Sequence, residues 1–452
     1  MKIGILLTVI LLLTSNTLHL KAQKSWTLEE CISHAMENNL HLKRSLLQVE
    51  SSQADFTQSA YEMGPNLAGF YNHQYSKGTT FNQYTLRFEN IENQGGSLGL
   101  SSSLTLFDGL YGFNNRLRLK HQLESKKEDA EIMKNNITLS VVAGFLQVLM
   151  DTENLKLASE QHVVSIKHLE KAEVELKLGR ISQGDYLTIK SQSINQRALL
   201  TSAQNRLAYS TIELTQLLEL ENPEDFSIKI TPITLSNNLD SNGFEELFQE
   251  VFPNRPEIRK AKSDYLSAES GLKMAYGLLS PKVYLNYQLG SGYDQSAWYR
   301  TPDSIFVQYP DYTYSQQLKD YVQQRISFQI SIPLFQRLTY KTSITKSKIQ
   351  VLDAQIAAEQ AERMVYKDVQ NAFAQAQAAW DNYKAYSESA ESFKELYNQT
   401  VSRFELGMVN ALDLGVAQNN LVKAEGELLH AKYTYLLRTK ILDFYRGIPI
   451  SL

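Results

Sequence analysis

Leu104-Thr105-Leu106-Phe107 begins a stretch that ends at Leu178-Gly179, and Ile332-Pro333-Leu334-Phe335 begins a second stretch that ends at Leu406-Gly407. The separation from residue 107 to 179 and from 335 to 407 is the same, 72 positions. Each stretch reads as the end of a strand followed by one very long polar helix. A helix of that length rises roughly 105 Å at 1.5 Å per residue, several times the width of a small domain. A compact core does not need such a rod, whereas a structure that crosses a wide gap does.

The apolar positions of the second long stretch recur at close to 3.5-residue spacing. Ile349, Leu352 and Ile356 illustrate the pattern, and the segment 372–379 is rich in Ala and Gln. This spacing places the apolar residues in a narrow stripe along the helix and leaves its opposite side exposed to solvent, which is typical of coiled-coil packing. We therefore expect a mainly α-helical protein with long helices packed as in coiled coils.

The repeat extends over most of the chain. Phe244-Glu245-Glu246 matches Leu28-Glu29-Glu30 at an offset of 216 positions, and after Phe335 the offset is 228. The sequence predicts four parts: a signal peptide at 1–22, a first repeat at 23–220, a linker at 221–243 and a second repeat at 244–452. Each repeat is expected to hold a helix, two strands, a long helix and a returning helix of about half its length.

The first residues have the composition of an export signal. Lys2 precedes an apolar run at 3–13, and Leu20-Lys21-Ala22 resembles a cleavage site. No later run approaches 18 apolar residues, so we expect no transmembrane helix after the signal. The formal net charge of −4 argues against a nucleic-acid partner.

Four segments alternate between apolar and polar residues, as strands do. Their lengths suit tilted strands that cross a bilayer, which need roughly 9–11 residues. Loops rich in aromatic residues connect the two members of each pair, as expected near a membrane interface. An antiparallel sheet with one face on a soluble core would also alternate. We favour the membrane because no spare apolar surface exists to cover four such faces. The strands are predicted at 66–75, 97–107, 283–290 and 326–334, and the loops at 76–96 and 291–324.

Motifs for catalysis or cofactor binding are missing from the sequence: it has no HExxH, GxSxG, GxxxxGK[ST] or GxGxxG. We therefore predict no enzyme activity, no catalytic residue and no cofactor. Cys31, His34 and His41 lie on one helical face and could form half of a soft-metal site. Ordinary helix packing explains the same spacing, so we predict a buried Cys31 and no metal site.

The chain resembles the family of TolC-like outer membrane efflux proteins over nearly its whole mature length. Its most specific match is Arg403-Phe404-Glu405-Leu406-Gly407, followed by Asp413-Leu414 and Ala417-Gln418, which is similar to that family's helix-turn-helix tip. The first repeat keeps Gly179 and Asp185 but has Glu175 in place of the arginine.

The resemblance implies a homotrimer in the cell outer membrane with a long periplasmic extension. Each chain would contribute four strands to a 12-stranded barrel and its long helices to a periplasmic α-barrel. Such a protein is an exit duct of a tripartite efflux or type I secretion system and docks on a periplasmic adaptor (membrane fusion) protein and an inner-membrane pump. The predicted strands independently support an assembly of several chains. Four strands cannot close a barrel alone, and open strand edges are too unfavourable in lipid.

The turns at the ends of the long helices are the predicted adaptor-contact sites. Their residues are Gly179 and Arg180 in the first copy and Arg403, Gly407 and Met408 in the second. Both glycines are expected to adopt the left-handed conformation that ends a helix.

Asp185 and Asp413 lie six residues beyond the two glycines and are candidate gate acids. Both also fit the third position of a capping box, a purely structural role.

Two other classes of protein remain open at this point. A structural or adhesive coiled-coil protein anchored in the outer membrane would use the rods as spacers and would not need a polar lumen. A passive porin would have most of its residues in strands rather than in helices. Within the duct class, the sequence does not distinguish export of drugs, metals or proteins.

Overall fold

The computed structural model describes residues 25–82, 86–220, 226–229, 235, 248–249, 252–448 and 450. The predicted signal peptide and most of the predicted linker lie outside them. The chain divides into two compact units. The first holds residues 1–45, 130–256 and 363–452, and the second holds 46–129 and 257–362. Each unit therefore contains segments of both predicted repeats, and the repeat boundaries themselves stay a prediction.

The helices confirm the expected mainly helical fold. The two longest, α4 and α9, have 67 residues each, and the two that follow them, α5 and α10, have 35 each. The helices are α2 (Leu28–Asn38), α3 (Leu40–Tyr61), α4 (Tyr111–Lys177), α5 (Gln183–Leu217), α7 (Pro256–Gly277), α8 (Tyr314–Asp320), α9 (Thr339–Glu405) and α10 (Ala411–Tyr445), with a 3₁₀ turn, η2, at Phe252–Asn254.

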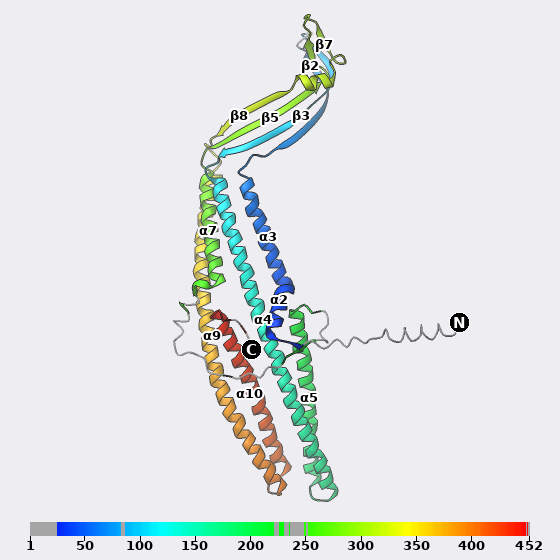
Figure 1. Ribbon diagram of the computed structural model, residues 1–452, viewed down its shortest axis with the longest axis vertical. Coiled ribbons are helices and arrows are strands. Elements are labelled where there is room, and N and C mark those ends of the chain that lie inside the picture. The colour runs from blue at the N-terminus through cyan, green and yellow to red at the C-terminus, as the bar shows by residue number, and fades with distance from the viewer. Residues whose placement is uncertain are drawn as a thin grey trace, which may run out of the picture. The chain divides into compact units, whose positions relative to one another are not determined.

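The strands in the described part of the chain form one large sheet and two small ones. They are β1 (Ser25–Trp26), β2 (Ala68–Asn82), β3 (Arg87–Phe107), β4 (Ser227–Ile228), β5 (Lys282–Asp294), β6 (Trp298–Arg300), β7 (Phe306–Gln308) and β8 (Gln323–Ser331). The large sheet is antiparallel in the order β2-β3-β5-β8, so each predicted repeat supplies two neighbouring strands (Figure 1). β1 pairs with β4 in parallel, and β6 pairs with β7.

The predicted loop at 76–96 is wrong, because most of it is strand. β2 and β3 continue far beyond the predicted ends and pair as far as Asn82 opposite Arg87. An antiparallel hairpin satisfies its backbone groups by pairing alone and does not need an apolar face in water. Lys77 pairs with Glu92 and the ring of Phe81 lies against Phe88 across the two strands, which supports the extension. The second predicted loop, 291–324, contains β6, β7 and α8.

The start of α2 has the predicted capping box. The Glu30 amide donates to Thr27 Oγ1 (3.2 Å), and the Thr27 amide donates to Glu30 Oε2 (2.9 Å). Asn39 separates α2 from α3, since its Oδ1 accepts hydrogen bonds from the amides of His41 (3.0 Å) and Leu42 (3.3 Å). This side chain caps α3 and explains the interruption that Asn38-Asn39 predicted.

The core of the first unit is built on the middle of α4. Val141, Val142 and Phe145 are completely buried there and pack in one cluster with side chains of α2, α5 and α10. Of the described helices, α4 is the one with a segment long and apolar enough to cross a membrane by length and composition. Its apolar residues are those of this core, so packing against other helices accounts for them.

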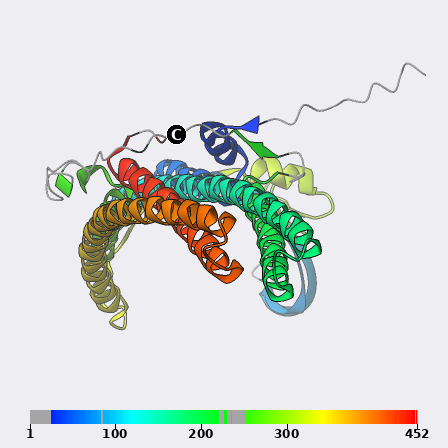
Figure 2. The same ribbon diagram turned by 90° about the horizontal axis from the view of Figure 1, so that it is seen from below.

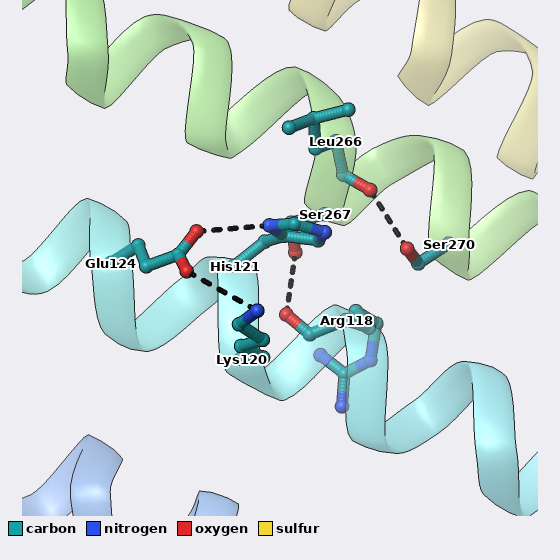
Figure 3. A network of polar contacts seen from close by, with 7 residues as sticks. All are labelled: Arg118, Lys120, His121, Glu124, Leu266, Ser267 and Ser270. Atoms are coloured by element: carbon teal, nitrogen blue, oxygen red, sulfur yellow. Dashed lines mark hydrogen bonds and ion pairs between the residues drawn. The ribbon is translucent and has the colours of Figure 1, made fainter.

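In the second unit, polar contacts join α7 to the first part of α4. Ser267 Oγ donates to the Arg118 carbonyl (3.2 Å), beside the intrahelical pair of His121 and Glu124 (3.0 Å), as Figure 3 shows. Further along, Arg259 Nη2 binds Glu128 Oε2 (2.8 Å). These contacts are mostly half-exposed, so they fix the register of the two helices more than they stabilise them.

The junctions between strand and long helix have the same backbone in both copies. Gly109 and Leu110 have φ angles of 73° and 62°, and their counterparts 228 positions later, Arg337 and Leu338, have 50° and 63°. Two consecutive left-handed residues turn the chain sharply from the sheet into the helix. Glycine adopts this conformation without strain, whereas arginine and leucine do so at a cost.

Candidate functional site

The turn after α4 is a Schellman motif. The Gly179 amide donates to the Leu176 carbonyl (3.0 Å), and the Arg180 amide donates to the Glu175 carbonyl (2.9 Å). Gly179 has the left-handed conformation that this motif needs, with φ of 68°. The predicted role of Gly179 in ending the helix is therefore confirmed.

The turn after α9 repeats the motif. The Gly407 amide donates to the Phe404 carbonyl (3.0 Å), the Met408 amide donates to the Arg403 carbonyl (2.9 Å), and φ of Gly407 is 73°. A Cβ at either glycine would meet nothing within 4 Å, so the φ angle alone selects glycine here. We define the tips as 177–182 and 405–410.

The helix that leaves each tip is capped by its own side chains. Ser182 Oγ accepts from the Asp185 amide (3.1 Å) and donates to Asp185 Oδ2 (2.6 Å). Asn410 Oδ1 accepts from the Asp413 amide (2.9 Å), and the Asn410 amide donates to Asp413 Oδ2 (3.4 Å). The predicted capping role of both acids is thus seen in the structure, with a complete capping box at Asn410.

Side chains tie the two helical hairpins together near their tips. Ala172, Ile189 and Ala411 form a small buried cluster, and Lys171 Nζ binds Glu405 Oε1 at 3.2 Å. Seen from below, α5 lies beside α4 and α10 beside α9 (Figure 2). The tips of the two copies therefore form one structure rather than two independent loops. The sequence did not predict these contacts, because the repeat aligns equivalent positions of the two copies without showing which side chains touch.

A histidine lies in the contact between the hairpins. His168 Nε2 lies 3.4 Å from the Tyr397 hydroxyl. Burial lowers the pKa of His168 below its ordinary value, Lys171 nearby lowers it further, and Glu405 opposes the effect. A neutral imidazole is therefore the stable form at neutral pH.

The predicted adaptor-contact side chains are exposed. Arg180 and Arg403 lie on the surface, and Leu406 and Met408 are 75% and 65% exposed. Arg403 is in the last turn of α9, where a positive charge is favourable. The tips thus combine apolar and basic side chains, a composition that suits contact with another protein.

The large sheet has one apolar and one polar face where β3, β5 and β8 pair. The strand register aligns three leucines of β3 with alternate residues of β5, and those residues of β5 with alternate residues of β8. The side chains between them point to the other side of the sheet. The apolar face consists of Leu98, Leu100, Leu104, Leu285, Tyr287, Leu289, Ile326, Phe328 and Ile330. The polar face consists of Ser97, Ser101, Ser103, Thr105, Asn286, Gln288, Arg325, Ser327 and Gln329.

The apolar face of the sheet is exposed in the single chain. Ile326 and Phe328 are 71% and 69% exposed. The polar face is linked across strands, since Ser103 Oγ donates to Asn286 Oδ1 (2.8 Å). Among the described strands, β2 and β8 each have a free edge. Leu106, predicted on the apolar face, falls in a bulge at the end of β3 and has no partner in β5.

The sequence predicts that Cys31 is buried by helix packing, and the structure confirms the burial. Cys31 is completely buried in the core of the first unit, and the His34 ring lies edge-on to Trp26 at 5.2 Å. Over the described part of the chain, no group of three or more His, Cys, Asp and Glu side chains could hold a metal ion.

Comparison with known proteins gives a consistent match. Residues 247–446 match the sequence family described as outer membrane efflux protein. The outer membrane efflux protein BepC of Brucella suis is 21% identical over 97% of this chain and 89% of that protein. The outer membrane protein TolC of Escherichia coli is 18% identical over 67% of this chain and 60% of that protein. The CmeC outer membrane channel of Campylobacter jejuni superposes with a TM-score of 0.79 at 14% identity, over 93% of this chain and 85% of that chain.

Proposed function

We propose that the chain is a member of the outer membrane efflux protein family, whose model matches residues 247–446, and that it is an exit duct in the outer membrane. It passes substrates from the periplasm, or from an inner-membrane pump, to the exterior as part of a tripartite efflux or type I secretion system. No step in this role makes or breaks a covalent bond, in keeping with the lack of catalytic motifs in the sequence.

The two-faced sheet is the observation that carries this proposal. Exposed apolar side chains such as Ile326 and Phe328 suit lipid, and the serines and amides on the other side suit a water-filled passage. A free strand edge in lipid leaves backbone groups without hydrogen bonds, which is too costly to persist. The edges of β2 and β8 therefore need other copies of the chain, and three copies give the 12-stranded barrel expected for the family.

The tips are the proposed contact for a periplasmic adaptor. Gly179, Arg180, Arg403, Gly407 and Met408 lie in or beside two exposed turns that a buried cluster holds together. Exposed apolar side chains with neighbouring arginines are typical of protein contact surfaces. Asp185 and Asp413, beyond their capping role, are proposed to line the passage at this end and to favour cations.

A spacer or adhesive protein is the competing interpretation. Rods that serve only as spacers do not require a continuous polar face on the sheet. The polar row Ser101, Gln288 and Arg325 has no purpose in such a protein but is expected in a channel wall.

Reconstitution tests the duct directly. The purified protein should be a trimer by light scattering in detergent, and it should conduct ions when inserted into a planar lipid bilayer. A stable monomer, or a trimer that inserts without conducting, would contradict the proposal.

Cross-linking tests the adaptor contact. Cys31 is buried and is the single cysteine of the chain, so Met408→Cys offers one reactive thiol at the tip. We expect it to cross-link to a periplasmic adaptor in cells, whereas Ser327→Cys on the sheet should not. If Gly407→Pro folds, inserts and leaves transport intact, the adaptor contact is elsewhere.

A further inference from the structure

The polar face of the sheet has a concave region of about 510 Å³. Its lining includes aromatic, amide and cationic side chains within one short section of the four strands. Its lining includes Phe70, Gln288, Gly290 and Arg325.

The Phe70 side chain extends over two glycines in this region. A Cβ at Gly99 would come within 2.9 Å of Phe70 Cζ, and one at Gly290 within 3.6 Å. Gly99 pairs with both Phe70 and Gly290, so the ring starts on β2 and reaches across β3 toward β5. Two facing glycines thus make room for an aromatic surface on a face that is otherwise polar.

Arg325 is an isolated charge on the same face. It lies opposite Gln288, and the nearest charged positions on this face of β5 are Lys282 and Asp294. Each is six residues from Gln288, about 20 Å along a strand. This distance exceeds the screening length of roughly 8–10 Å in physiological salt.

The guanidinium of Arg325 is available to a ligand. It has no hydrogen bond or ion pair with any residue that the structure describes. The closest acid along the chain, Asp320, instead accepts a hydrogen bond from the Tyr312 hydroxyl (3.2 Å). A planar cation of this kind binds carboxylates and sulfonates through two parallel hydrogen bonds.

We propose that Phe70 and Arg325 form a binding site for organic anions that carry an aromatic ring. The guanidinium binds the anionic group, Gln288 offers a further amide donor, and the Phe70 ring packs against the aromatic part of the ligand. This inference rests on the proposed function, because the polar face must line the lumen. In the assembled duct, the site recurs once per chain and forms a ring of cations that favours anions at this level.

Block of single-channel current tests the site, with naphthalene-2-sulfonate as the probe. The probe should block the wild type, and its half-blocking concentration should rise at least tenfold in Arg325→Gln and severalfold in Phe70→Leu. Arg325→Lys should keep the anion preference of the current but lose most of the block. Methanesulfonate, which lacks the ring, should block much more weakly than naphthalene-2-sulfonate.

Lys282→Gln is the matched control, since it removes a cation from the same face about 20 Å away along the strand. Its block should equal that of the wild type. A wild type that does not conduct refutes the duct itself. A conducting wild type whose block is the same in Arg325→Gln, or is lost equally in Lys282→Gln, refutes the anion site and leaves the duct standing.

Discussion

Replacing Asp413 by asparagine separates its two roles, because the change removes the charge and keeps a capping oxygen. The Asp413 amide still donates to Asn410 Oδ1 (2.9 Å), and an amide oxygen at 413 can still accept from the Asn410 amide. That second bond is long at 3.4 Å, so little is lost with it. The remaining cost is the interaction of the charge with the start of α10, about 0.3–1 kcal/mol.

The expected effect on ion preference follows from the Coulomb energy. At roughly 10 Å from a pore axis, one charge in water contributes about 0.4 kcal/mol to a passing monovalent cation before screening. Three such charges, screened at 0.1 M salt, raise the local concentration of cations about twofold and lower that of anions about twofold; at 0.01 M salt each factor is about fourfold. Asp413→Asn should therefore lower cation preference, more strongly in dilute salt, while the melting temperature changes little.

Reversal potentials in a planar bilayer at both salt concentrations provide the assay. Asn410→Ala is the control, since it removes the capping oxygen at a cost of about 1 kcal/mol and keeps the charge. It should lower the melting temperature without changing ion preference. If Asp413→Asn conducts with an unchanged reversal potential in 0.01 M salt, Asp413 is a cap and nothing more.

Three further predictions concern the helix ends and the contact between hairpins. Glu219 ends α5 in the left-handed conformation, with φ of 56°, and Gly447 ends α10 with the same hydrogen-bond pattern. Because glycine adopts this conformation without strain, Glu219→Gly should stabilise the protein by about 1 kcal/mol. An unchanged or lower thermal midpoint would show that Glu219 is not strained. Gly109→Ala should destabilise the protein by at least about 2 kcal/mol, because its Cβ would lie 2.5 Å from the Gly277 carbonyl oxygen. Arg337→Gly at the equivalent position should stabilise the protein, because Arg337 has a left-handed backbone conformation. Equal effects of the two changes in thermal unfolding would contradict this. The pKa of His168 should lie below 6.5 in an NMR titration of the folded protein. As the pH falls, the unfolded chain then takes up the proton before the folded protein does, so stability decreases below about pH 6.5. A pKa at or above 6.5 would contradict the effect of burial on His168.

The helical part of the fold could be predicted from the sequence because its signals are local and occur twice. Gly179 and Gly407 mark the ends of two equally long helices, and Ser182 and Asn410 begin the returning ones. A helix end depends on a few neighbouring residues, so each signal is complete within one turn.

Features that depend on distant partners could not be predicted in this way. The polar extension of β2 and β3 lacks the alternation that marks a half-buried strand, and pairing alone stabilises it. Arginine at position 337 does not predict a left-handed backbone, because arginine rarely adopts that conformation. The glycine at the equivalent position of the first copy, Gly109, is the one indication in the sequence. The organic-anion site joins Phe70 to Arg325, which no spacing rule connects.

The free edges of β2 and β8 have a genetic consequence. In the proposed ring, β8 of one chain pairs with β2 of the next, so every chain is needed for closure. A substitution that spoils one edge would therefore disable each ring that contains even a single altered chain. Where a cell makes altered and normal chains in equal amounts, only roughly one trimer in eight would consist of normal chains alone. Edge mutations in this protein are thus expected to be dominant over the normal copy, whereas mutations that prevent the chain from folding at all should be recessive.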